Sequence, residues 1–162
     1  MAVEQKILEI LEKDSSITAA QIAVMLDLPL IQVQEIIDRL EEDNTIVAYK
    51  AVVNWEKTEK QAVTAFIEIK ASPQHGAGFE KIAERISKYP EVQSVFLMSG
   101  SYDIAVIMEG KTLADVSNFV WERLAVMESV VSTATHFVLK KYKEDGVALF
   151  PEPADERGFS FI

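Results

Sequence analysis

The order of apolar segments between residues 61 and 142 constrains the fold of this chain more than any other feature. Residues 61–71 alternate between apolar and polar side chains, as a half-buried strand does. Helical spacing follows over residues 79–89, and two apolar runs at 92–98 and 104–108 flank a short polar turn. A second helical pattern begins at 111, and residues 130–142 have the pattern of a last long strand. This order predicts a ferredoxin-like βαββαβ domain, an antiparallel sheet with both helices on one face.

The strands of this domain are apolar on both sides, although two helices can cover only one face of the sheet. A second subunit is the simplest cover for the other face. We therefore expect a homodimer, joined through sheet residues that are either Val63, Ile67, Val106 and Phe137 or their alternating neighbours. The second helix is expected to bury one face, made of Leu113, Val116, Phe119, Val120, Leu124 and Met127.

The first third of the chain has the pattern of three helices. Residues 3–13 carry apolar side chains at helical spacing, Thr18 and Gln21 form the pattern of a capping box, and a third helix is expected from about Leu30 to Glu42. Residues 45–49 have the pattern of a strand, and residues 50–55 either pair with it as a wing or lead out of the domain. These elements predict a winged helix-turn-helix, and a small helical bundle without a DNA role is the alternative.

Four segments follow from these patterns. The winged helix-turn-helix occupies residues 1–55, a short charged linker 56–60 and the ferredoxin-like domain 61–142. Residues 143–162 are expected to form a polar extension, with Phe150, or Phe159 and Phe161, as the candidates for anchoring it.

Composition limits the classes of function that fit. The chain has 162 residues, a net charge of −10 and no cysteine, and it has no apolar run long enough to span a membrane. These features favour a cytoplasmic protein without disulfides and without membrane contact. Residues 1–57 hold five basic against eleven acidic residues, a net charge of −6. Because cationic contacts to phosphates supply most of the affinity for DNA, any DNA binding should depend on an assembly that presents several such domains.

The turn Ser99-Gly-Ser-Tyr-Asp103 joins the two apolar runs. Gly100 can adopt a positive φ at little cost, which suits a tight connection between antiparallel strands. The carboxylate of Asp103 can accept an ammonium group, while hydroxyls and backbone amides hold the other end of a small zwitterion. A hairpin turn made of ordinary turn residues is the alternative.

No catalytic or metal-binding set stands out. His75 and His136 lie on different predicted elements, so neither belongs to a cluster of metal ligands. Gly76-Ala-Gly78 lacks the third glycine and the lysine of phosphate-binding loops. We therefore expect no cofactor, no metal and no enzymatic activity.

The chain resembles the leucine-responsive/asparagine-type (Lrp/AsnC) family of transcription regulators. The resemblance covers roughly residues 3–142, and its matching stretches are 7–14, the helix-turn-helix through Arg39-Leu40, 46–49 and 95–103. It implies a homodimer that assembles into a higher oligomer, double-stranded DNA as a partner, and an amino acid or similar small effector bound between subunits. The Gly-x-Tyr-Asp turn of the family falls on Gly100, Tyr102 and Asp103.

The resemblance assigns the DNA-facing role to Gln32, Gln34 and Arg39, residue types that can hydrogen-bond adenine and guanine. Further hydroxyls for the effector are expected from Ser99, Ser101 and, across a subunit boundary, Thr133 or Thr135. Two departures matter: Ser101 stands where the family often has Asp, and Arg39 is the one basic residue of the third helix. The alternative function is an acidic amino-acid sensor that acts on a protein partner and has little affinity for DNA.

Overall fold

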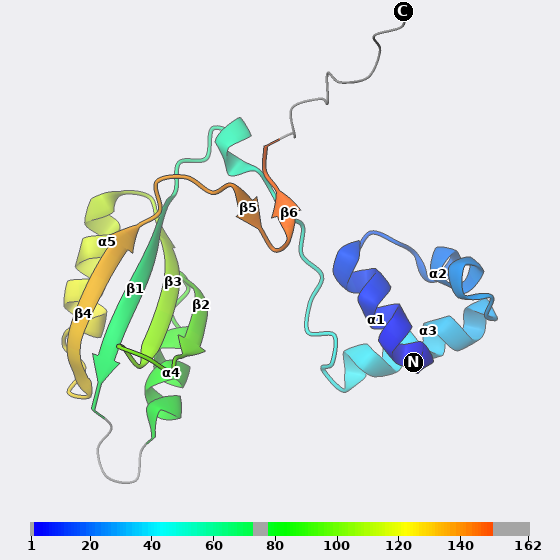
Figure 1. Ribbon diagram of the computed structural model, residues 1–162, viewed down its shortest axis with the longest axis horizontal. Coiled ribbons are helices and arrows are strands. Elements are labelled where there is room, and N and C mark those ends of the chain that lie inside the picture. The colour runs from blue at the N-terminus through cyan, green and yellow to red at the C-terminus, as the bar shows by residue number, and fades with distance from the viewer. Residues whose placement is uncertain (1, 73–77, 151–162) are drawn as a thin grey trace, which may run out of the picture. The chain divides into compact units, whose positions relative to one another are not determined.

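The computed structural model describes residues 2–72 and 78–150 of the chain. This part divides after Val53 into two compact units (Figure 1). The first unit is helical, and the second is built on a sheet.

The N-terminal unit contains the three predicted helices, α1 (Val3–Lys13), α2 (Ala19–Leu26) and α3 (Leu30–Glu42). The predicted capping box begins α2, because the Gln21 amide donates to Oγ1 of Thr18 at 3.3 Å and the Thr18 amide donates to Oε1 of Gln21 at 2.9 Å. Asp27 ends α2 with φ of 53°, which allows the tight turn into α3. The three helices enclose one apolar core, made of Ile7, Leu11, Ile22, Ala23, Val33, Ile36, Ile37 and Leu40.

The strand predicted at residues 45–49 is wrong, since residues 45–54 contain no strand. Residues 45–53 contain none of the Gly, Asn or Asp residues that tight hairpin turns prefer, so a hairpin of 45–49 with 50–55 is disfavoured. The segment instead folds back along the end of α3: the Ile46 amide donates to the Leu40 carbonyl at 2.8 Å, and the Tyr49 hydroxyl donates to Glu41 at 2.8 Å. Partial burial and this bond to Glu41 raise the pKa of Tyr49 to about 12.

The C-terminal unit is built on a four-stranded antiparallel sheet with the order β2-β3-β1-β4. Its strands are β1 (Val63–Ala71), β2 (Val92–Leu97), β3 (Ile104–Gly110) and β4 (Val130–Phe137). Helices α4 (Phe79–Ser87) and α5 (Leu113–Phe119) pack on one face, and α5 continues into a π-helical turn at Val120–Leu124 (Figure 1). The predicted α+β, ferredoxin-like βαββαβ order is confirmed.

The register of the sheet decides which residues face the helices. Ile67 and Val106 are paired across β1 and β3, and both are fully buried in the core that α4 and α5 cover. Of the two sets predicted for the open face, the set with Ile67 and Val106 is therefore wrong. The alternating neighbours, including Phe66 and Ile107, lie on the face that no described helix covers.

The face predicted for the second helix needs one correction. Val116, Phe119, Leu124 and Met127 are buried, but Leu113 is 56% exposed. Thr112 and Asp115 form a capping box that was not predicted, with the Thr112 amide donating to Asp115 at 2.8 Å. Leu113 is then the first helical residue, on the solvent side of the first turn.

The last predicted strand is too long, because β4 ends at Phe137. A short hairpin follows, β5 (Lys143–Glu144) with β6 (Val147–Ala148), turned by Asp145 at φ of 45° and Gly146 at φ of 81°. An Asp-Gly pair between two strands is a strong hairpin signal, so this element was predictable from the sequence. Of the candidate anchors for the extension, the ring of Phe150 lies 5.7 Å from that of Tyr142, whereas 151–162 fall outside the described residues.

The predicted linker is ordered in part. A 3-10 turn, η1 (Trp55–Lys57), occupies it, and Lys60 places its Nζ 4.1 Å from the centre of the Trp55 ring. The Asn54 side chain donates to the Leu149 carbonyl at 2.7 Å. The start of the C-terminal unit is thus tied to its last described residues.

No single helix in the described residues has the length and apolar character needed to cross a membrane. Only α2 and α3 taken together, bent by 119° at their junction, meet those two criteria.

Candidate DNA-binding helix and effector turn

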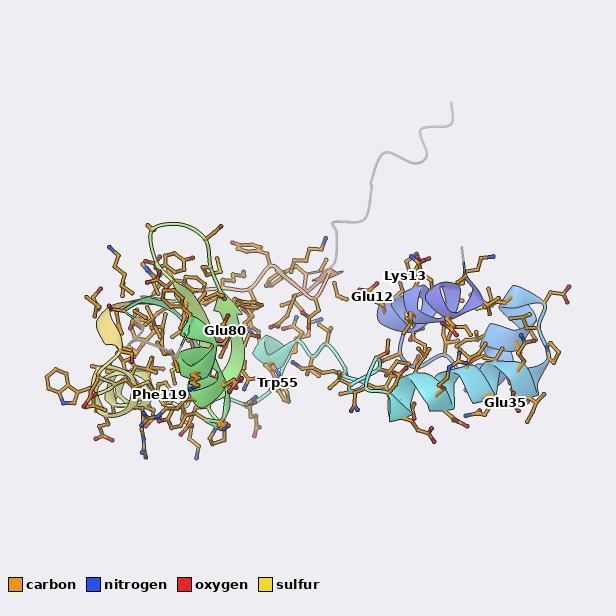
Figure 2. All side chains as sticks on the ribbon, turned by 90° about the horizontal axis from the view of Figure 1, so that it is seen from below. Glu12, Lys13, Glu35, Trp55, Glu80 and Phe119 are labelled. Carbon is orange, nitrogen blue, oxygen red and sulfur yellow. The ribbon has the colours of Figure 1, made fainter. Side chains whose placement is uncertain are left out.

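The outward face of α3 is apolar and acidic. Val33, Ile36, Ile37 and Leu40 point into the core. At about 100° per residue, the opposite side of the helix carries Ile31, Glu35 and Asp38. Figure 2 labels Glu35, which lies on the side of α3 away from α1. A helix with this face gains little from DNA phosphates.

The three residues predicted to contact DNA do not share one face of α3. Gln32 and Arg39 lie on the same side, two turns apart, whereas Gln34 is turned by about 200° from Gln32. Arg39 forms an ion pair with Glu4 of α1, and both side chains are half exposed. Gln34 donates to Asp38 at 2.8 Å. Arg39 and Gln34 are thus already partnered within the unit, in exposed contacts that cost little to exchange.

Exposed apolar side chains surround the turn between α2 and α3, and the sequence argument did not single them out. They are Val24, Met25, Leu30 and Ile31, between 51% and 83% exposed. The N-terminal residues of a recognition helix contact base edges, and apolar side chains there can contact thymine methyl groups. The high exposure of these residues, rather than their type, is the signal, and only a structure supplies it.

The turn between β2 and β3 is closed at its base. Leu97 pairs with Ile104, and the Met98 amide donates to the Asp103 carbonyl at 2.8 Å. Gly100 has φ of +151°, so its predicted positive φ is confirmed. Ser99, Gly100 and Ser101 are exposed at the tip, while Tyr102 and Asp103 are half-buried.

Asp103 binds the turn to the neighbouring strand β1. Its amide donates to the Ile69 carbonyl at 2.9 Å, and its Oδ2 accepts from the Ala71 amide at 2.8 Å. The register of β1 against β4 shifts between Lys70 and Ala71, and this irregularity leaves the Ala71 amide to the carboxylate. Asp103 therefore has a structural role, and a carboxylate has further lone pairs for a ligand.

Tyr102 connects the turn with the open face of the sheet. Its ring stands edge-on to Phe66 at 6.2 Å, and Phe66 in turn lies 6.2 Å from the ring of His136. His136 Nε2 is 3.4 Å from a carboxylate oxygen of Glu68. The turn and the open face thus form one continuous surface of aromatic and charged groups.

The remaining effector candidates lie apart from this surface within one chain. Thr133 pairs with Ile69 and Thr135 with Ile67, and the side chains of both isoleucines belong to the core under the helices. Thr133 and Thr135 are therefore on the helix-covered face, opposite Tyr102. The expectation that they contribute to an effector site across a subunit boundary stays a prediction.

His75, Gly76 and Ala77 lie outside the described residues. Over the described ranges 2–72 and 78–150, no three His, Asp or Glu side chains come together as a metal site requires.

Comparison with known proteins assigns a class to each unit. Residues 2–47 match the model of a winged helix-turn-helix DNA-binding domain, and residues 64–148 match the model of the Lrp/AsnC ligand binding domain. The two together define a DNA-binding transcriptional regulator that carries a ligand-binding domain.

Relatives agree with this class over nearly the whole chain. YugG of Bacillus subtilis (strain 168), an uncharacterized HTH-type transcriptional regulator, is 44% identical over 155 residues, which cover 95% of this chain and 93% of YugG. The chain therefore belongs to the Lrp/AsnC family.

Two solved structures share the fold. An AsnC family transcriptional regulator from Agrobacterium tumefaciens has a TM-score of 0.70 at 25% identity, and covers 89% of this chain and 93% of its own. The transcriptional regulator NMB0573 from Neisseria meningitidis, solved as an L-Met complex, has a TM-score of 0.68 at 23% identity, with 89% and 92% covered.

Proposed function

We propose that this regulator binds double-stranded DNA sequence-specifically and responds to an amino acid or a similar small molecule bound between subunits. The observation that carries the proposal is the Gly100–Asp103 turn, which Asp103 fixes to β1 and Tyr102 joins to the open sheet face. A ligand at this turn would touch both the turn and the surface that a second subunit would cover. It could therefore change the geometry of the assembly.

A homodimer through the open face is the assembly that the sheet supports best. Phe66, Ile107 and Phe96 give this face its apolar part, and Phe96 is 50% exposed in a single chain. Exposed aromatic and aliphatic side chains on a sheet favour a protein partner. Dimers assembling into a higher oligomer would then present several copies of α3 to DNA. Light scattering that gives a monomer at micromolar concentration would contradict this part of the proposal.

The proposed effector is a zwitterion of the amino-acid class. The L-Met complex of NMB0573 supports this class, since that protein shares the fold. In this chain Tyr102, Asp103 and the hydroxyls of Ser99 and Ser101 are the proposed contacts. Asp103→Asn keeps an acceptor for the Ala71 amide but removes the charge. Isothermal titration should show loss of amino-acid binding at an unchanged oligomer mass, whereas full affinity in this variant would exclude an ammonium contact by Asp103.

DNA binding is proposed to use Gln32, Gln34 and Arg39. Arg39→Ala should weaken binding to the chain's own upstream DNA by about 1–3 kcal/mol. Lys13→Ala, which removes the same charge from α1, is the matched control and should have a smaller effect. Glu4→Gln frees Arg39 from its ion pair and should strengthen binding. Equal losses in Arg39→Ala and Lys13→Ala would show that only net charge matters and that Arg39 makes no contact.

The second candidate function is an amino-acid sensor that acts on a protein partner. The outward face of α3 favours it, because Ile31, Glu35 and Asp38 suit a protein surface better than a phosphate backbone. A salt titration of DNA binding separates the two candidates: specific binding at low salt supports the regulator, and its absence supports the sensor.

The predicted domain limits of 1–55, 56–60, 61–142 and 143–162 are part of the proposal. The compactness of the two units on either side of Val53 supports the first boundary. The β5–β6 hairpin begins at Lys143, where the predicted extension begins, and the Asn54 side chain donates to the Leu149 carbonyl within that extension.

A further inference from the structure

A cleft of about 650 Å³ lies at the end of the sheet where β1 and β2 begin and β3 ends. Its walls come from four segments, residues 60–62, 90–93, 108–111 and 115–123. The Gly100–Asp103 turn is at the other end of β3, about 20 Å away along the strand. The cleft is therefore separate from the proposed effector turn.

The floor of the cleft is apolar and rigid. Met108 is 1% exposed and Phe119 is 6% exposed, and the Phe119 ring packs edge-on against Tyr89 at 5.3 Å. Figure 2 labels Phe119 at the end of α5. A Cβ on Gly110 would lie 3.1 Å from Cγ2 of Val116, so the glycine allows α5 to start close to the end of β3. This close approach fixes the wall opposite the strand ends.

Some charged groups of the cleft have structural roles. Glu109 lies 3.6 Å from Lys60 Nζ and 3.7 Å from Lys141 Nζ, and Asp115 accepts from the Thr112 amide at 2.8 Å. These contacts explain why each of these side chains is present. The two lysines also compensate the charge of Glu109 without a ligand, and the Thr112 amide engages Asp115 in the capping box of α5.

Other charged groups of the cleft have no such explanation. Glu91, Glu122 and Lys111 form no ion pair with any residue of the described ranges, and Arg123 has only the face of the Tyr89 ring, at 5.9 Å. Both signs of charge are thus available on the rim of one apolar floor. Amide side chains of Gln61, Gln93 and Asn118 complete the rim.

The backbone at Glu122 and Arg123 is a second, independent observation. These residues belong to the π-helical turn Val120–Leu124, which is closed by a bond from the Ala125 amide to the Val120 carbonyl at 2.8 Å. Single π-helical turns are rare and occur frequently at functional sites. Here the turn bears the two oppositely charged side chains of the cleft that lie next to each other in the sequence.

We propose that this cleft is a second small-molecule site, which binds an α-amino acid with a large apolar side chain. The ammonium would meet Glu122, with Glu91 on the same rim, and the carboxylate would meet Arg123, with Lys111 on the same rim. The side chain would cover Met108 and Phe119. A simple anion would be repelled by the two glutamates and a simple cation by Lys111 and Arg123. A bound ligand would touch residues 60–62, which follow η1, so it would act on the segment that joins the two units in the sequence.

Isothermal titration of the full-length protein with L-leucine, L-methionine and L-phenylalanine tests the site. At least one of them should bind, and Arg123→Gln and Glu122→Gln should each weaken that binding by at least about tenfold. Glu84→Gln, on the exposed side of α4, and Lys88→Gln, at the exposed residue that follows α4, make the same charge changes and should leave the binding within about twofold.

Asp103→Asn distinguishes this cleft from the turn. Binding that survives Asp103→Asn and is lost in Arg123→Gln supports a second site, whether or not the turn binds an effector. Binding that is lost only in Asp103→Asn overturns the inference and leaves the proposed function intact. Absence of binding for all three amino acids, or equal effects in the cleft and α4 variants, also overturns it.

Discussion

Replacing Asp103 by alanine should destabilise the C-terminal unit even when no ligand is present. The half-buried carboxylate accepts the Ala71 amide at 2.8 Å, at the point where the register of β1 against β4 shifts. Alanine would leave this amide without its acceptor, in a partly buried position at the end of β1. A side chain that serves only the ligand contributes little to stability in the ligand's absence, so this expectation separates a structural aspartate from one that serves the ligand alone.

The structure sets the expected magnitude. A hydrogen bond to a charged acceptor is worth about 1.5–3 kcal/mol, and leaving its donor buried and unpaired costs about as much. We therefore expect Asp103→Ala to lower the free energy of unfolding by about 2 kcal/mol, or Tm by about 10 °C for a unit of this size. Asp103→Asn keeps a neutral acceptor and should cost about half as much.

Tryptophan fluorescence during urea unfolding measures this effect in the intact chain. Both tryptophans, Trp55 and Trp121, lie in the C-terminal unit, so the signal reports on that unit. Ser101→Ala, in the exposed tip of the same turn, is the control and should stay within about 0.5 kcal/mol. Because the proposed assembly would also stabilise the folded state, all variants are compared at one protein concentration. If Asp103→Ala is as stable as Ser101→Ala, the bond to Ala71 does not support the turn.

Three further predictions concern two glycines, the cap of α2 and the titration of one aspartate. Gly110→Ala should lower the free energy of unfolding by about 1–3 kcal/mol in the same assay, because a Cβ there would lie 3.1–3.3 Å from three atoms of residues 112–116. Gly100→Ala has no atom within 4 Å of its Cβ and should cost only the strain of its positive φ, about 1 kcal/mol. Thr18→Ala removes the capping box of α2 and should lower the thermal midpoint of the N-terminal unit, seen by far-UV circular dichroism, by the equivalent of about 1 kcal/mol. Hydrogen bonds from Thr45 lower the pKa of Asp43 from its usual 3.8. The contribution of Asp43 to the stability of the N-terminal unit should therefore be fully present above pH 3.8 and be lost as the pH falls through the lower pKa of the folded state. An acid titration of the same circular dichroism signal measures this dependence, and Asp43→Asn should remove it.

Periodic patterns predicted most of the fold. The three N-terminal helices and the βαββαβ order were predicted because apolar residues recur at 3.6 or at 2 residues, and the structure has the same elements. Errors occurred where a strand pattern had no partner. Residues 45–49 look like a strand but have no neighbour to bond, and β4 stops at Phe137 although apolar residues continue. A strand exists only when another strand pairs with it, and the sequence does not list pairs.

The sites were less predictable than the fold. The turn at Ser99–Asp103 was found because glycine and polar residues interrupt two apolar runs, but its bond to Ala71 depends on a register shift that no local pattern reveals. The cleft beyond Gly110 joins residues 60–62, 90–93 and 108–123, three parts of the chain that no local pattern links. Helical spacing is enough to place Arg39 on a face of α3. Its ion pair with Glu4 is not predictable in this way, because it joins positions 35 residues apart. Contacts between distant segments need the tertiary structure.

The acidic character of the N-terminal unit should make DNA affinity sensitive to the proposed effector. Residues 1–57 carry a net charge of −6, and the one cation of α3 is held by Glu4. A single unit should therefore gain little from phosphates, and we expect the proposed specific binding to need two or more units held at the spacing of their half-sites. If two units must bind together, a small change in assembly geometry changes the effective concentration of the second unit at its half-site. Most of the affinity for DNA would change with it. A strongly basic unit would bind DNA alone and would respond far less to its effector.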